Sequence, residues 1–168
     1  MRDRQTVTSD SLPTAALLEG MSVRHLTTHV DDRGSLVELM DSRWGQPDPL
    51  VSAYSFTVRP GVAKGWALHK EHEDRYANLS GEAEVLLYDV RPSSSTLGQL
   101  CRVRMSEYDR CVVNVPIHVW HATRNLGSDD FVAINFPTRP FIHDHPDKYR
   151  LPLDTPLIPF SFGATPGW

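Results

Sequence analysis

A succession of short, β-rich segments separated by turn-forming residues constrains the fold of this chain most. From Val23 onward the runs VRHLTTHV, SLVELM and VSAYSFTVR alternate with the turn DDRG and with breaks rich in Pro and Gly. Further strand candidates lie at residues 82–91, 99–105, 110–115, 118–124 and 130–136. No convincing amphipathic helix interrupts them, and many short strands at close spacing are typical of a β-sandwich or barrel. The sequence therefore predicts an all-β fold.

The length of 168 residues is that of one domain. Residues 1–22 have no sustained hydrophobic period, so we expect an N-terminal arm that is mobile or forms a short helix around Ala15 to Leu18. We expect a single domain over residues 23–168. Its last part, residues 137–168, holds seven prolines, which lack the amide donor of a β-ladder. This composition predicts an extended wrap over the barrel, with one helical turn near Asp147 to Arg150.

Charge and hydrophobicity exclude several classes of partner. The net charge of -4 leaves no basic excess, so we expect no nucleic-acid partner. No apolar run approaches the about 18 residues needed to cross a bilayer, and the N-terminus lacks the apolar core of a signal peptide. We therefore expect a cytoplasmic protein with no membrane partner. Cys101 and Cys111 lie in predicted strands, and in that compartment they are expected to be buried free thiols.

Two polar stretches between the predicted strands hold the candidate site residues. Residues 61–81 contain His69 and Asp74, and residues 116–125 contain His121. Successive residues of a strand alternate between its two faces, so inward side chains from two antiparallel strands of a small barrel meet in one cavity. We therefore expect these three side chains to share one site.

The spacing within both stretches resembles the two motifs of the cupin superfamily. The matching positions are Gly61, His69, Asp74 and Gly81 in the first motif and Pro116, His121 and Asn125 in the second. In the first motif two residue types differ, because Ala67 stands at the position of the first histidine and Asp74 at that of the glutamate. In the second motif His118 and Arg110 stand at the positions of the two glycines. The resemblance implies a double-stranded β-helix, or jelly roll, and the superfamily's divalent metal site. Imidazole and carboxylate suit Fe, Mn, Ni or Zn. Since one ligand is lost, no cofactor is favoured, and a metal on His69, Asp74 and His121 is the alternative.

A closer resemblance covers most of the chain. The segments DDRGSLVEL at 31–39, KGWALHK at 64–70, YDVRPSSSTLGQL at 88–100 and VPIHVWHAT at 115–123 resemble the dTDP-4-dehydrorhamnose 3,5-epimerase family and the related dTDP-sugar 3,4-ketoisomerases. This resemblance implies a jelly roll, a homodimer that exchanges N-terminal strands, a nucleotide-linked 4-keto sugar as substrate, and no metal.

The resemblance to the ketoisomerases accounts for more of the residues than the resemblance to the epimerases. The epimerase base falls on Ala67 and the epimerase tyrosine falls near Ala133, so both groups are missing from their usual positions. The ketoisomerase pattern retains His69 and Lys70, and Tyr54 falls where that family has a site tyrosine.

The expected reaction removes a proton next to a ketone, which requires a base and donors for the enolate oxygen. The hypothesis makes His69 the base, oriented by Asp74, with a tyrosine or Lys70 as donor or acid. The candidate catalytic residues are His69, Asp74, Tyr54, Tyr76, Lys70 and His121. The candidate substrate- and nucleotide-binding residues are Lys64, Arg75, Arg91, Arg33, Trp66 and Asn125. The resemblance places Arg91 near the nucleotide, and Lys64 is of the charge type that meets a pyrophosphate.

Simpler readings and other functions stay open beside this one. His121 lies beside Trp120, and the alternative is that it is a buried core histidine whose hydrogen bonds are satisfied. His72 lies between two glutamates, and we expect these residues to form a solvated turn. His143 and His145 are expected in an exposed loop. The predicted protein is an isomerase of nucleotide sugars, and the alternatives are a metal-dependent cupin enzyme and a non-catalytic binder of nucleotide sugars.

Overall fold

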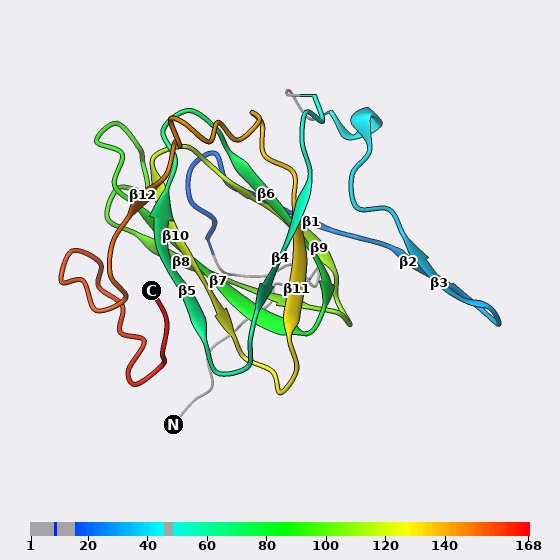
Figure 1. The fold of residues 1–168 in the computed structure, drawn as a ribbon. Helices are drawn as coiled ribbons and strands as arrows, with labels where there is room; N and C mark the ends of the chain where they lie inside the picture. Colours follow the sequence, from blue (N-terminus) through cyan, green and yellow to red (C-terminus); the bar gives the residue numbers. More distant parts are fainter. Residues whose placement is uncertain (1–8, 10–15, 46–48) are drawn as a thin grey trace.

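The computed structural model describes residue 9, residues 16–45 and residues 49–168, and these form a β-barrel of two antiparallel sheets. The first sheet has the order β1 (Ser22–His25), β9 (Cys111–Val115), β6 (Asp74–Ser80), β11 (Phe131–Asn135) and β4 (Tyr54–Val58). The second has the order β12 (Tyr149–Arg150), β5 (Ala63–Leu68), β10 (Val119–Asn125), β7 (Glu82–Asp89) and β8 (Leu100–Ser106). Figure 1 shows the sheets around a common interior. The predicted all-β jelly roll is confirmed.

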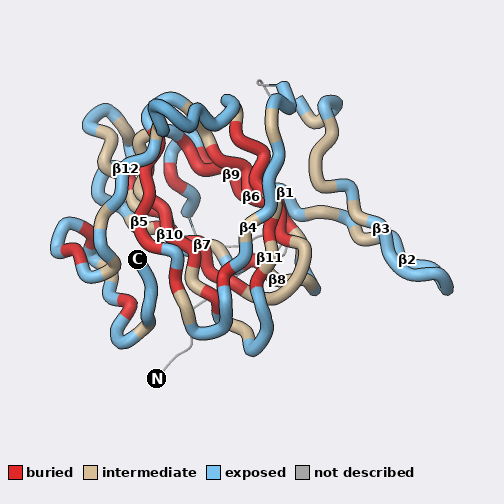
Figure 2. Tube along the Cα trace, in the orientation of Figure 1, coloured by how far each residue is buried: buried red, intermediate tan, exposed pale blue. Residues whose placement is uncertain are grey.

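The main hydrophobic core lies between the two sheets, and the buried stretches of Figure 2 follow the strands that enclose it. In β7, Val85 and Leu87 point into this core, whereas Leu86 points to the opposite face. There Leu86 packs in a second cluster with Trp66 and with Phe162 of the C-terminal segment. Because the wrap covers this outer face, β7 is buried on both sides, as its continuous apolar run predicts.

The proline-rich segment from residue 137 onward runs over the second sheet, as predicted (Figure 1). The expected helical turn near Asp147 to Arg150 is wrong, because Tyr149 and Arg150 form the short strand β12. They pair antiparallel with Leu68 and Ala67 at the outer edge of β5. The open edge of β5 offers unpaired backbone groups, and extending the sheet satisfies them where a helical turn would not.

The described part of the N-terminal arm is not helical. Leu18 and Met21 are buried in the main core, and β1 begins at Ser22 and pairs with β9. Residue 15, where the expected short helix would begin, lies outside the described residues. No helix within the described ranges is long and apolar enough to cross a membrane. Cys101 and Cys111 are buried free thiols, as predicted, and burial raises the pKa of both.

A two-stranded hairpin projects from the barrel between β1 and β4 (Figure 1). It consists of β2 (Thr28–Asp31) and β3 (Gly34–Val37), joined at the predicted DDRG turn, and the short 3-10 helix η1 (Ser42–Trp44) follows. Val30 and Leu36 on the hairpin are 76% and 62% exposed. The homodimer that exchanges N-terminal strands stays a prediction.

Candidate active site

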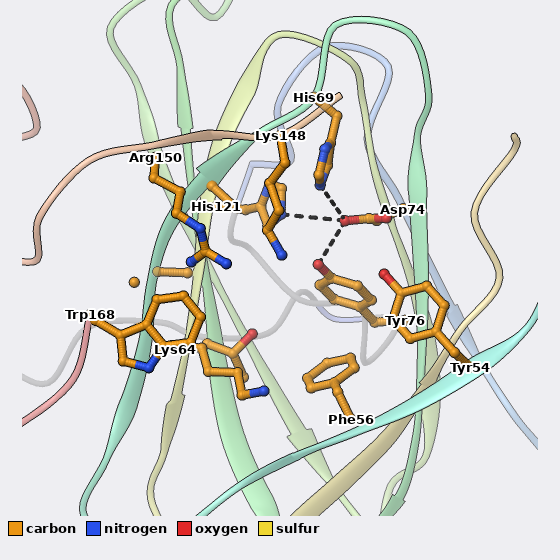
Figure 3. A pocket seen from close by; sticks show the side chains of 14 residues that line it. Tyr54, Phe56, Lys64, His69, Asp74, Tyr76, His121, Lys148, Arg150 and Trp168 are labelled. Carbon is orange, nitrogen blue, oxygen red and sulfur yellow. Dashed lines mark hydrogen bonds and ion pairs between the residues drawn. The ribbon is translucent and has the colours of Figure 1, made fainter. Parts of the chain in front are cut away.

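A cavity of about 150 Å³ opens inside the barrel, and Figure 3 shows the side chains around it. It is lined by strands β4, β5, β6 and β10 and by the C-terminal wrap. The lining residues are Tyr54, Phe56, Lys64, Gly65, Ala67, His69, Asp74, Tyr76, His121, Ala122, Thr123, Lys148, Arg150 and Trp168. Five of the six predicted catalytic residues are among them.

Asp74 is the centre of the site. It is 1% exposed at the start of β6, and its Oδ2 lies 3.2 Å from His69 Nε2, 3.4 Å from His121 Nε2 and 2.8 Å from the Tyr76 hydroxyl. Its Oδ1 accepts a hydrogen bond of 2.6 Å from Asn135 Nδ2. Burial opposes the charge of this carboxylate, yet the hydrogen bonds from His121 and His69 outweigh it and hold the pKa of Asp74 well below its ordinary value. Asp74 therefore stays ionised in the barrel interior.

His69 follows β5 and is held at both ring nitrogens. Its Nε2 faces Asp74, and its Nδ1 donates to the main-chain carbonyl of Asp147, since a carbonyl oxygen can only accept. Burial disfavours the charged ring, but the hydrogen bond and charge of Asp74 prevail, so the pKa of His69 is raised above its ordinary value. A proton that reaches Nε2 is stabilised there by the adjacent carboxylate.

His121 lies on β10, and its ring is 6.0 Å from that of Tyr76, which bonds to the same Asp74 oxygen. Its Nδ1 donates to the carbonyl of Val119 at 3.2 Å, and its ring is 5.3 Å from that of His69. Burial, followed by the charge of Asp74, raises the pKa of Tyr76 well above its ordinary value, so this hydroxyl stays protonated and donates to the carboxylate. His121 is thus buried, as the core reading requires, and also part of the site.

Tyr54 on β4 offers a hydroxyl at the edge of the same cavity. Its oxygen accepts a hydrogen bond of 2.8 Å from Asn135 Nδ2, which also donates to Asp74. Tyr54 is 47% exposed. Burial and then the negative charge of Asp74 raise the pKa of Tyr54. Its own proton is therefore retained and available to a ligand in the cavity.

Cationic and aromatic side chains form the opposite side of the cavity (Figure 3). Lys148 and Arg150 extend from β12 and the residue before it, and the Arg150 guanidinium lies 3.9 Å from the ring of Trp168. Desolvation lowers the pKa of both cations, and for Lys148 the charge of Arg150 adds to it. Lys64 on β5 lies 5.8 Å from the ring of Phe56. The cavity thus has an acid–base wall and a cationic wall.

Three predicted binding residues point away from the cavity. Trp66 is fully buried on the outer face of β5, where it packs edge-on against Phe162. Arg75 is buried and donates its Nε to the carbonyl of Phe136 at 2.7 Å. Asn125 donates to the carbonyls of Val58 and Asp129 at 2.7 and 2.8 Å and so fixes a turn. Strand alternation turns Trp66 and Arg75 away from the site, whereas Asn125 lies at the end of β10 and is held by its two bonds to carbonyls.

Three further predicted residues lie outside the cavity at the surface. Arg33 forms an ion pair with Asp31 at the tip of the projecting hairpin. Arg91 forms an ion pair of 2.7 Å with Asp89 after β7. Lys70, predicted as a donor or acid, follows His69 on the opposite face, and its ammonium lies 4.1 Å from the ring of Tyr149. The structure does not bring Lys70 to the acid–base wall.

The expectation of a solvated turn at His72 is wrong for the histidine itself. The His72 ring stacks on His69 with centroids 4.1 Å apart, and its Nδ1 donates to Asp147 Oδ2 at 3.0 Å. Burial, and next the charge of His69, lower the pKa of His72. His143 and His145 are exposed, as predicted.

Sequence reasoning missed several residues that shape the site. They are Phe56, Asn135, Asp147, Lys148, Arg150 and Trp168. The sequence could have indicated Asn135, because it is a polar residue at an inward position of a predicted strand. The sequence could not have indicated the residues of the wrap, because a proline-rich segment has no hydrophobic period that shows which side chains face the barrel.

The barrel, with two histidines beside a buried carboxylate, has the architecture of a cupin. The chain belongs to the polysaccharide biosynthesis C-terminal domain family, whose model matches residues 29–149. It is 34% identical over 150 residues to a probable low-salt glycan biosynthesis epimerase, Agl13, of Haloferax volcanii, which covers 88% of this chain and 96% of the relative. It is 32% identical to the spore coat polysaccharide biosynthesis protein SpsL of Bacillus subtilis, over 88% of this chain and 98% of that protein.

A solved structure shows the same architecture. The dTDP sugar isomerase of Desulfovibrio desulfuricans G20 superposes with a TM-score of 0.81 at 26% identity, covering 88% of this chain and 95% of that one. The predicted family resemblance is confirmed, and so is the expected class of enzyme, an isomerase of the epimerase type.

Proposed function

We propose that the protein epimerises a nucleotide-linked 4-keto-6-deoxy sugar by removing and returning a proton next to the ketone. The observation that carries this proposal is the buried Asp74 carboxylate, which orients His69, His121 and Tyr76 along one wall of a cavity whose other wall is cationic. The similarity to the Haloferax relative, a probable glycan biosynthesis epimerase, and to the Desulfovibrio structure, a dTDP sugar isomerase, supports it.

The base in this proposal is His69. The proton and its bonding electrons separate at the carbon next to the ketone: the proton moves to His69 Nε2 and the electrons form the enolate. The nearby charge of Asp74, 3.2 Å from Nε2, stabilises the imidazolium that results. This use of His69 explains how the site can act with Ala67 at the position where the epimerases resembled by the sequence carry their base.

The proton donor is Tyr54. Its oxygen accepts from Asn135, so its own hydrogen is free to turn toward the cavity. Return of this proton to the carbanion from the side opposite to His69 inverts the carbon and gives the epimer. Return to a neighbouring position would give ketoisomerisation instead. The cycle closes when Tyr54, which is 47% exposed, regains a proton from solvent and His69 releases the proton that it took.

Binding is assigned to the cationic wall. Lys148, Arg150 and Lys64 carry positive charge to the side of the cavity that faces the acid–base wall, where the diphosphate of a nucleotide sugar would meet them. Phe56 and Trp168 provide apolar faces beside them. In this proposal the anionic part of the substrate and its reacting carbon lie on opposite sides of one cavity.

The test is hydrogen exchange in D₂O with a dTDP-linked 4-keto-6-deoxy sugar, followed by proton NMR. The wild-type protein should introduce deuterium next to the ketone, and the NMR couplings of the product distinguish epimerisation from ketoisomerisation. His69→Ala should slow exchange by about 10² to 10⁴, the usual contribution of a general base. His143→Ala, at an exposed histidine, is the matched control and should exchange at the wild-type rate. A wild-type protein that binds the sugar nucleotide and exchanges nothing would be a binder, and a fully active His69→Ala would exclude His69 as the base.

A metal-dependent reaction is the second candidate, and one observation favours it. His69 and His121 both direct Nε2 to Asp74 Oδ2, while their Nδ1 atoms donate to main-chain carbonyls. Histidines that ligate metals usually make this second hydrogen bond, and two imidazoles with one carboxylate suit Fe, Mn, Ni or Zn. Stoichiometric metal in protein purified without chelator, lost in His121→Ala, would support a metal enzyme. Activity that persists after removal of all bound metal would contradict it.

A further inference from the structure

Asp147 belongs to the C-terminal wrap, yet it contacts the whole turn that follows β5. Its carboxylate accepts hydrogen bonds from the backbone amides of Lys70 at 2.9 Å and Glu71 at 2.7 Å and from His72 Nδ1 at 3.0 Å. Its main-chain carbonyl accepts a hydrogen bond from His69 Nδ1. One residue of the wrap is therefore bonded to four consecutive residues of the segment that carries the proposed base.

The bond from His69 to the Asp147 carbonyl determines which ring nitrogen is free to react. A carbonyl oxygen only accepts, so the bond to Asp147 requires hydrogen on Nδ1, and Nε2 then carries a hydrogen and donates to Asp74 only when the ring is charged. Nε2 is the nitrogen that faces Asp74 and the cavity. The place of this carbonyl depends in turn on the carboxylate of the same residue, which fastens the wrap to the amides of the turn.

The residues that follow Asp147 carry the cationic wall. The Lys148 amide donates to the carbonyl of Pro146 at 2.8 Å, which forms a tight turn, and Tyr149 and Arg150 then join the edge of β5. Side chains alternate along this strand: Lys148 and Arg150 line the cavity, whereas Tyr149 faces outward under the ammonium of Lys70. The position of both cations is thus set from the anchor immediately before them.

We propose that Asp147 is a positioning residue that joins the two walls of the site: its carbonyl holds His69 in the tautomer with hydrogen on Nδ1, and its carboxylate docks the strand that brings Lys148 and Arg150 to the substrate. This inference rests on the proposed function only in giving His69 the role of base. The contacts of Asp147 predict a tautomer and an anion affinity, which are measured without turnover.

The experiment combines two variants with one control. Asp147→Ala removes the carboxylate, and Asp147→Asn keeps a single acceptor oxygen for the amides of the turn. Asp144→Ala changes an exposed acid in the same loop and controls for the loss of one negative charge near the cations. The first readout is the ¹⁵N NMR spectrum of the histidine side chains at a pH where the rings are neutral, with the His69 signal assigned through His69→Gln. The second is the affinity for dTDP as a probe, measured by calorimetry.

The wild-type protein and Asp144→Ala should show His69 with hydrogen on Nδ1, and Asp147→Ala should shift it toward hydrogen on Nε2. Asp147→Ala should weaken dTDP binding about tenfold, the effect of losing hydrogen bonds to a charged group, and Asp147→Asn should lie in between. A wild-type tautomer and wild-type dTDP affinity in folded Asp147→Ala would overturn the proposal. If Asp147→Ala does not fold, the same two measurements on Asp147→Asn decide, because an unchanged tautomer and an unchanged dTDP affinity in that variant contradict the proposal equally.

The outcome for Asp147 is separate from the outcome for the proposed function. If the wild-type protein exchanges no hydrogen, the proposed function is refuted, and the His69 tautomer and the dTDP affinity still test the role of Asp147.

Discussion

The two walls of the cavity are built in different ways. Asp74, Tyr76 and His121 of the acid–base wall lie on β6 and β10, which are paired with neighbouring strands on both sides, and the polar groups of this wall converge on the buried Asp74 carboxylate. Lys148 and Arg150 of the cationic wall come from the C-terminal wrap, which is held by the two-residue pairing of β12 and by the contacts of Asp147. The acid–base wall is therefore built mainly into the sheets, which suits chemistry, whereas the cations of the wrap are attached to the edge of a sheet, which suits binding.

This difference implies that damage to each wall has a different signature. A change in the acid–base wall removes both reactivity and stability, because it leaves buried polar groups without partners. A change in the cationic wall alters substrate affinity and the attachment of the wrap, and it leaves the barrel core intact. The following changes test the comparison.

Asp74→Ala is expected to have the largest effect. It leaves His69, His121 and Tyr76 without their shared acceptor in the barrel interior, and breaking a buried charge pair costs about 3–5 kcal/mol of the free energy of unfolding. Urea denaturation measures this loss, and the exchange assay should show a rate reduced by about 10² or more. Asp154→Ala, at an exposed acid of the wrap, should change neither quantity. Unfolding at the wild-type urea concentration would show that Asp74 does not hold this wall together.

The acid–base wall was largely predictable from sequence. Strand alternation placed His69, Asp74 and His121 on one side of the barrel, and the structure brings their side chains to one oxygen atom. The same alternation places Trp66 on the face of the strand opposite to His69, so the sequence already argued against a role for Trp66 in substrate binding. Lys64 differs, because the register between β5 and β10 shifts between His121 and Thr123, and such an irregularity redirects side chains in a way that spacing does not reveal.

The part of the cationic wall that the wrap contributes was not predictable. Proline spacing indicates an extended path for the wrap and gives no register against β5, so neither Lys148 nor Arg150 had a signal. Asp147 was equally hidden, since its role depends on contacts with residues 75 to 78 positions earlier in the chain. Non-local contacts made by irregular segments are the part of a site that local pattern does not determine.

Gly65→Ala is expected to have the next largest effect. A Cβ at this position would overlap the backbone carbonyl of Trp168, which accepts a hydrogen bond from the Gly65 amide. We expect overpacking to lower the free energy of unfolding by about 1–3 kcal/mol and to loosen the end of the wrap, as measured by thermal unfolding and by limited proteolysis. Gly127→Ala is the matched control, since its Cβ would meet no atom closer than 3.6 Å. Equal stability of the two variants would contradict the close docking of the wrap at β5.

Lys148→Ala and Arg150→Ala are expected to have smaller effects, confined to binding. Each should raise KM about tenfold, because each removes a charged partner of the substrate's anionic group, and each should leave kcat within about twofold. Lys70→Ala removes a cation from the outer face of the same edge and serves as the control, with KM unchanged. A fall in kcat with constant KM in Lys148→Ala would instead assign Lys148 to the chemical step.

The most direct test of the account is the pH dependence of hydrogen exchange in the wild-type protein and in Asp74→Asn. A general base acts in its neutral form, so exchange should fall as the pH drops through the pKa of His69, which Asp74 raises above its ordinary value. Asp74→Asn keeps the shape of the side chain and removes its charge, so the pKa of His69 should fall and the acidic limb of the profile should move to lower pH. This shift is the predicted result. An acidic limb at the same pH in both proteins would contradict the claim that Asp74 tunes His69 as the base.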